Sequence, residues 1–164
     1  MAILVRGKTK CSLCGEVIKS GEEVVSFPAF ISNLLSPLFE FSDAAFHAAC
    51  FHRHPFAEKV HASYKETVER AGPGHRFCVV CKREITHPDD YFTLGHLTAE
   101  RASPLYRYNH TQLHRSCLGS WPELSHVHRL LDELQCSGRW KGAALEKLLD
   151  EVRRNLPRYK EDNR

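Results

Sequence analysis

The chain has 164 residues, of which 42% are hydrophobic and 26% charged, and its formal net charge is +3. This composition excludes a disordered chain, which is poorer in apolar residues, and no run of about 20 apolar residues is present to span a membrane. The apolar stretch within residues 1–6 is too short for a secretory signal, so we expect a cytoplasmic protein, or a nuclear one in a eukaryote.

The sequence contains an internal repeat, in which positions 7–55 align without a gap with positions 74–122 and share ten identities. The repeat pairs Cys11 with Cys78, Cys14 with Cys81, His47 with His114 and Cys50 with Cys117. Chance similarity does not preserve four potential ligands and the spacing between them, so we infer an internal duplication. Clustered Cys and His in a reducing compartment indicate metal ligands before disulfides.

Each unit predicts the same elements in the same order. A Cys-x-x-Cys turn and an acidic turn precede two strands, and a His-x-x-Cys segment at the start of a helix comes before a longer helix. In the first unit we place the acidic turn at 21–23, the strands at 24–27 and 38–41, and the longer helix at 56–71. In the second unit the acidic turn is at 88–90, the strands at 91–94 and 105–108, and the longer helix at 123–135.

A final helix is predicted at 142–155, with Leu145, Leu148, Leu149 and Val152 on one side. It is expected to pack back on the second unit, and residues 157–164 read as a frayed tail. Residues 1–138 hold 15 basic and 15 acidic side chains, whereas residues 139–164 hold eight basic and five acidic ones. The surplus of positive charge therefore lies in the C-terminal segment. It indicates either a solvated helix face or a surface that contacts an acidic partner.

The predicted domains are a first metal-binding module at 1–71 with its trailing helix, a linker at 72–74, a second module at 75–138, and a C-terminal helix with a basic tail at 139–164. The fold class that follows is α+β, with a β-hairpin and a helix in each module and additional C-terminal helices.

Three thiolates and one imidazole per unit form the closed tetrahedral donor set of structural zinc. The segments between the two ligand pairs, 15–46 and 82–113, are equal in length and long enough for a β-hairpin. A redox Cys-x-x-Cys pair would need a surrounding βαβ pattern, which is absent. We therefore predict two structural Zn²⁺ ions, held by Cys11, Cys14, His47 and Cys50 and by Cys78, Cys81, His114 and Cys117.

The order of Cys-x-x-Cys, hairpin and His-x-x-Cys resembles the treble-clef zinc-finger group. The segment from Phe46 to Phe51 is similar to part of a LIM domain, although the second cysteine set of LIM domains is missing. The segment from Lys8 to Cys14 is similar to the start of the zinc fingers of poly(ADP-ribose) polymerases, which recognise damaged DNA. The resemblance implies the fold more strongly than the function.

Protein binding is the first of three functions that the sequence leaves open. Residues 27–46 contain no Lys or Arg, which makes that segment a poor match for phosphate. Its apolar residues Phe30, Ile31, Leu34 and Leu35 are candidates for a partly exposed patch that contacts a protein partner. This favours a non-enzymatic adaptor.

DNA or RNA binding is the alternative, because the second unit combines cations and aromatic rings in Arg101, Arg107, Arg115, Tyr106 and Tyr108. A nuclease is the third possibility, since Asn109 and His110 before His114 are similar to a His-Asn-His motif. No paired carboxylates or nucleophile with its base accompany them, so we expect no catalytic residues.

Other Cys and His residues lie outside the repeated ligand pattern. We expect Cys136 to be a small buried residue. The remaining histidines are expected on the surface or behind the ligands, His96 and His110 among them.

Overall fold

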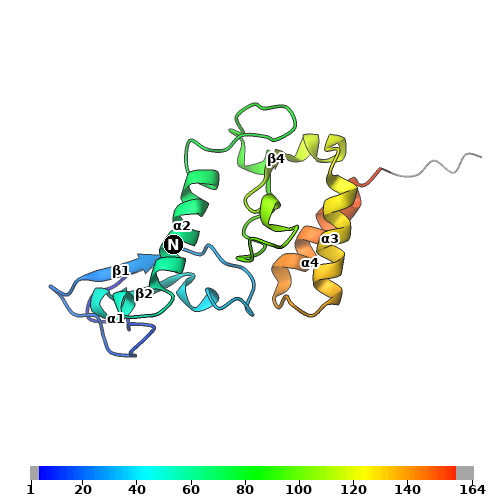
Figure 1. Ribbon diagram of the computed structural model, residues 1–164. Coiled ribbons are helices and arrows are strands. Elements are labelled where there is room, and N and C mark those ends of the chain that lie inside the picture. The colour runs from blue at the N-terminus through cyan, green and yellow to red at the C-terminus, as the bar shows by residue number, and fades with distance from the viewer. Residues whose placement is uncertain (1–3, 158–164) are drawn as a thin grey trace, which may run out of the picture. The chain divides into compact units, whose positions relative to one another are not determined.

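The computed structural model describes residues 4–157 and has an α+β fold with two antiparallel hairpins. The chain divides into two compact units, with the boundary between Gly72 and Pro73 (Figure 1). Each unit contains a two-stranded sheet followed by helices. The predicted C-terminal tail lies outside the described residues from position 158 onward.

The first unit pairs β1 (Val24–Phe27) with β2 (Ala44–His47), so that Val24 lies opposite His47. Two helices follow, α1 (Ala48–His52) and α2 (Ala57–Ala71). The predicted positions of β1 and α2 are confirmed.

Aromatic rings form the core of the first unit. Phe27 packs on Phe51 and on Tyr64 of α2, with ring centroids 5.3 Å apart in both pairs. Phe46 lies 5.5 Å from Phe41 and 5.7 Å from Phe51. Rings from the hairpin therefore meet rings from both helices, and this contact fixes the hairpin against the start of α1.

The second unit pairs β3 (Tyr91–Thr93) with β4 (Gln112–His114). A 3₁₀ turn over Pro88–Asp90 precedes this hairpin, and a 3₁₀ segment, η4 (Arg115–Ser120), follows it. The second His-x-x-Cys segment therefore begins a 3₁₀ helix, whereas the first begins α1.

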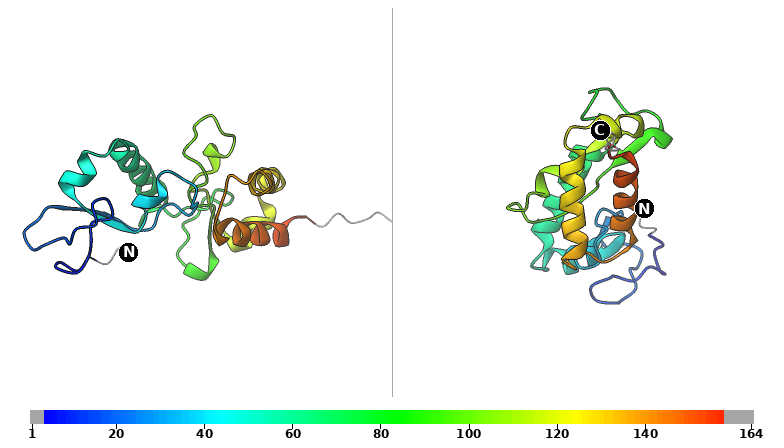
Figure 2. Two further views of the ribbon diagram at one scale, coloured as in Figure 1. Left: turned by 90° about the horizontal axis from the view of Figure 1, so that it is seen from below. Right: turned by 90° about the vertical axis from the view of Figure 1, so that its right-hand side faces the viewer.

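Two longer helices complete the second unit, α3 (Leu124–Cys136) and α4 (Ala143–Asn155). They lie side by side, as the right-hand view of Figure 2 shows. Their facing side chains are aliphatic, as the spacing predicts, and are buried: Leu124, Val127, Leu130, Leu131 and Leu134 from α3, and Leu145, Leu149 and Val152 from α4. Leu148 packs against this core and is only partly buried.

The strands predicted at 38–41 and 105–108 are wrong. Both segments are 3₁₀ turns, Phe39–Phe41 and Tyr106–Tyr108. In each, a backbone N–H donates to the carbonyl of a serine three residues earlier. Phe39 donates to Ser36 and Tyr106 donates to Ser103, both at 2.9 Å. The serine hydroxyl also accepts from the backbone N–H of Leu38 or Leu105, so the Ser-Pro sequence closes a local turn that competes with strand pairing. The second strand of each hairpin comes later.

The predicted apolar patch is wrong for two of its four residues, because Phe30 and Ile31 are buried, at 7% and 3% exposed. The Phe30 ring packs on Tyr64 with centroids 5.6 Å apart, so α2 covers it. Leu34 and Leu35 are 44% and 54% exposed. The patch that remains on the surface is therefore the Leu34–Leu35 pair.

One polar side chain fixes the loop between the strands in each unit. Ser42 Oγ accepts hydrogen bonds from the backbone N–H groups of Phe30 and Ile31, at 2.9 and 3.0 Å, and donates to the Ile31 carbonyl. At the equivalent position of the second unit, Asn109 Oδ1 accepts from Leu97 and Thr98 N–H. The two units therefore share a hydrogen-bond pattern that is made by two different side chains.

Asn109 also donates from Nδ2 to the Thr98 carbonyl at 2.8 Å, and it is 1% exposed. Asn109→Ala would leave the Leu97 N–H without an acceptor inside the protein, at a cost of about 2 kcal/mol. We expect amide hydrogen exchange at Leu97 and Thr98 to become about 30-fold faster. Gln135→Ala, at an exposed position of α3, should leave their exchange unchanged. Equal exchange in both variants would contradict this role of Asn109.

Candidate metal centres

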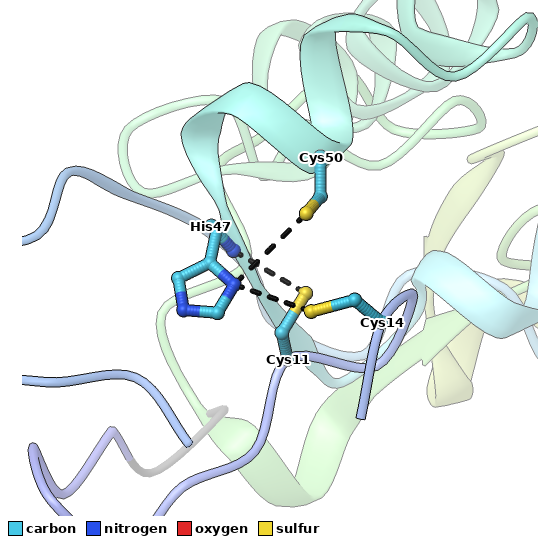
Figure 3. A group of neighbouring side chains, drawn as sticks. All are labelled: Cys11, Cys14, His47 and Cys50. Carbon is cyan, nitrogen blue, oxygen red and sulfur yellow. Dashed lines mark hydrogen bonds between the residues drawn. The ribbon is translucent and has the colours of Figure 1, made fainter. Parts of the chain in front are cut away.

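The structure brings the eight predicted ligands together as two clusters of four. In each cluster the donor atoms, three sulfurs and one ring nitrogen, lie within 4.8 Å of one another. The members are Cys11, Cys14, His47 and Cys50 in the first unit, and Cys78, Cys81, His114 and Cys117 in the second. Figure 3 shows the four side chains of the first cluster turned toward one another.

Two separate segments supply the ligands of each cluster. The Cys-x-x-Cys turn is held by Cys11 N–H donating to the Glu16 carbonyl and by Gly15 N–H donating to the Cys11 carbonyl, both at 2.8 Å. Gly15 has φ +78°, which glycine adopts without strain. His47 ends β2 and Cys50 lies in α1, so the junction of hairpin and helix aims the second pair at the first.

Backbone N–H groups stabilise the first thiolate of each turn. Burial alone raises the pKa of the Cys11 thiol, but hydrogen bonds from the backbone of Cys14, His47 and Leu13 outweigh it and lower the pKa to about 6. The His47 N–H lies 3.4 Å from Cys11 Sγ. Cys11 is therefore prepared as a thiolate, the form that binds a metal.

The last cysteine of each cluster shows the opposite shift. Burial, followed by the neighbouring Cys81 and Cys78 sulfurs, raises the pKa of the Cys117 thiol to about 11. Burial and the Cys14 and Cys11 sulfurs likewise raise the pKa of Cys50. Sulfurs this close repel one another as anions, and a divalent cation among them would remove that repulsion. The donor set therefore fits a soft divalent metal ion.

The histidines are oriented with Nδ1 toward the sulfurs. His47 Nδ1 lies 3.4 Å from Cys14 Sγ, and His114 Nδ1 lies 3.3 Å from Cys81 Sγ. Each Nε2 faces an oxygen at 3.2 Å, the Glu22 carboxylate in the first unit and the Glu84 carbonyl in the second. Such a partner on the far nitrogen fixes the ring and the tautomer that binds a metal through Nδ1.

The two centres differ in residues that the ligand spacing did not predict. Glu22 contacts a ligand histidine only in the first unit. In the second unit the Cys81 sulfur raises the pKa of the Arg83 guanidinium. The sequence does repeat the acidic turn, but Asp90 there accepts from the Ser116 N–H instead. Which acidic side chain reaches a histidine depends on geometry, and the alignment of the repeats carries no signal for it.

The cysteine outside the clusters and two of the histidines differ from expectation. Cys136 is exposed at the end of α3, because it lies off the apolar face that α4 covers. His96 and His110 are buried, with ring centroids 6.0 Å apart. His110 has φ +59° and follows Asn109, so it belongs to the fixed loop described above.

Two tandem Cys₃His modules account for the ligand pattern, and both fit a zinc-binding protein. No protein-family model, curated protein or solved structure matches the chain. Within residues 4–157 no helix combines the length and the apolar character needed to cross a membrane.

We expect two zinc ions per chain, one lost in Cys14→Ser and the other in Cys81→Ser. Native mass spectrometry or elemental analysis of purified protein measures this directly. Cys136→Ser should retain both ions, because Cys136 lies outside the clusters. Removal of either ion should unfold its own unit, since apparent binding free energies of structural zinc are on the order of 10 kcal/mol. Two ions retained in Cys14→Ser would contradict the assignment.

Glu22→Gln should weaken zinc binding at the first centre about 10-fold, because the amide is a poorer acceptor for the His47 N–H than a carboxylate. Competition with a chelator of known affinity measures the loss. The control is Asp89→Asn at the equivalent position of the second unit, where His114 uses a backbone carbonyl instead. The same loss in both variants would show a general charge effect.

Proposed function

We propose that the chain is a non-enzymatic zinc-dependent adaptor, in which two structural zinc modules of treble-clef type present a surface to a protein partner. Each centre offers four protein donors, so a tetrahedral ion has no open position for a substrate or a reactive water. A closed shell supports a structural role for the ion and a binding role for the chain.

The order of elements supports the treble-clef assignment. In the first unit an isolated bridge between Lys10 and Val17 closes the Cys-x-x-Cys turn. The β1–β2 hairpin comes next, and α1 begins directly after His47. Two ligands from a turn and two from the junction of hairpin and helix are the arrangement of LIM-type and poly(ADP-ribose) polymerase-type fingers, which the sequence resembles.

The observation that carries the proposal is the Leu34–Leu35 pair. Both side chains are about half exposed, in a segment without Lys or Arg. Asn33 holds them in a turn, since its Oδ1 accepts from the Leu35 N–H at 3.0 Å and its carbonyl accepts from Ser36. Two adjacent leucines on an ordered turn cost little to immobilise, which favours a protein contact.

The basic residues of the second unit give less support to nucleic-acid binding. Arg107 pairs with Glu123 at 2.7 Å, and Arg115 pairs with Glu151. Tyr108 is buried and cannot stack on a base. Cations that neutralise carboxylates of their own unit contribute less to phosphate binding. Arg101 and Tyr106 remain as candidates for this alternative.

The nuclease alternative is weakened in the same way. The Asn109 side chain uses its oxygen and its nitrogen to bind the backbone of Leu97 and Thr98. A side chain occupied in this way supports a role in holding the loop, and not in a reaction.

The pair Leu34→Asp and Leu35→Asp should reduce partner binding about 10-fold or more, because each buried leucine contributes about 1.5–3 kcal/mol. Nuclease-treated extracts passed over the immobilised full chain, with bound proteins identified by mass spectrometry, test this. The control is Ala102→Asp, which adds a charge at the position equivalent to Leu35. Zinc content is measured in every variant.

Proteins that the wild type and Ala102→Asp retain, and that the double leucine variant loses, would support the adaptor. An unchanged set of proteins in all three, with zinc content intact, would contradict it. Proteins that the chain retains from an untreated extract, but not from the nuclease-treated one, and that Arg101→Ala also loses, would favour the nucleic-acid alternative.

A further inference from the structure

The six ligand cysteines differ in their access to solvent. Cys11 and Cys78 are buried, three others are half-buried, and Cys14 is exposed. A depression of about 610 Å³ lies beside the first centre, lined in part by Cys14, Cys50, His47 and Glu22. A small molecule from solvent therefore reaches a ligand sulfur of the first centre directly.

The residues beside the equivalent sulfurs also differ. Arg83 follows the half-buried Cys81 by two residues in the chain and brings a positive charge. The equivalent residue in the first unit is Glu16, which brings a negative charge. The first centre has a second carboxylate, since Glu22 contacts His47. In the depression beside Cys14, the carboxylates of Glu16, Glu22 and Glu23 outnumber the one cation, Lys19.

Oxidation of a cysteine depends on thiolate character and exposure. A cysteine bound to zinc is a thiolate at neutral pH, so exposure and the charges of neighbouring side chains decide which ligand reacts. We infer that Cys14 is a modification site for peroxides, and that its oxidation to a disulfide with Cys50 releases the metal of the first centre alone. This inference rests on the zinc-dependent function proposed for the chain.

Cys50 is the partner that the geometry favours. Both sulfurs flank His47 Nδ1, at 3.4 Å for Cys14 and 4.0 Å for Cys50. Cys11 is buried and its sulfur accepts the His47 N–H, which makes it less available.

The chemistry balances with one peroxide per disulfide. The Cys14 thiolate attacks one peroxide oxygen, the O–O bond breaks, and hydroxide leaves a sulfenic acid behind. The Cys50 thiolate then attacks that sulfur, an S–S bond forms, and a second hydroxide leaves. Two thiolates lose two electrons, the peroxide gains them, and two protons convert the hydroxides to water. The ion loses two of its four ligands, and the first unit loses the link between its two ligand segments.

The test uses the full chain with Cys136→Ser, which removes the exposed thiol outside the clusters. Zinc content is measured first and should be two ions per chain. Hydrogen peroxide is then added while a chromogenic chelator reports zinc release, and alkylation with mass spectrometry identifies the oxidised cysteines. We expect the first ion to leave at least about 10-fold faster than the second, together with a Cys14–Cys50 disulfide.

Exchange of the neighbouring charges provides the matched control. Glu16 and Arg83 are both exposed, so neither substitution removes a core contact. Glu16→Arg should slow release from the first centre several-fold, and Arg83→Glu should speed release from the second.

Equal release rates at the two centres, or a first disulfide that contains Cys81, would overturn the inference while two zinc modules remain. A folded protein that contains no zinc before peroxide is added would overturn the proposed function as well.

Discussion

The fold of each unit depends on the convergence of four donors from two segments that lie far apart in the sequence. The turn after Cys11 orders the first two sulfurs, and the junction of β2 with α1 orders the other two. Units this small bury too little apolar surface to be stable with a wide margin. An ion bound by all four donors would join the two segments and supply free energy comparable to the stability of a whole domain. The hairpin then has a fixed base from which its loop extends.

Much of this arrangement can be predicted from the sequence, because the strongest signals are local or periodic. The internal repeat identifies the ligands, and the spacing of apolar residues in α3 predicts the face that α4 covers. The second strand of each hairpin cannot be found in this way. The alternating pattern of Leu38 to Phe41 is that of a strand, yet the hydrogen bond from Phe39 to Ser36 closes a turn first. The residue pattern is compatible with a strand and with a turn, and this local backbone hydrogen bond selects the turn.

Other features depend on contacts that no periodicity encodes. Phe30 and Leu34 have the same apolar character, but only Phe30 lies where the Tyr64 ring covers it. Arg107 is a residue type that often contacts nucleic acid, but its guanidinium forms an ion pair with Glu123 at 2.7 Å. Burial and pairing are properties of the folded arrangement, so sequence alone could not show that Phe30 is covered or that Arg107 is paired.

The duplication separates what the scaffold requires from what it permits. The loop in each unit needs one polar atom that accepts two backbone N–H groups, and Ser42 and Asn109 satisfy that need with different side chains. Positions outside this network differ in charge and polarity between the units. Leu34 of the first loop corresponds to Arg101 of the second, and Glu16 near the first ligands corresponds to Arg83 near the second. A substitution at an exposed position costs little stability, so one copy can gain a new contact while the other keeps the fold. The similarities between the two units are therefore those that the ligand clusters and the loop hydrogen bonds require, whereas these differences fall on exposed side chains.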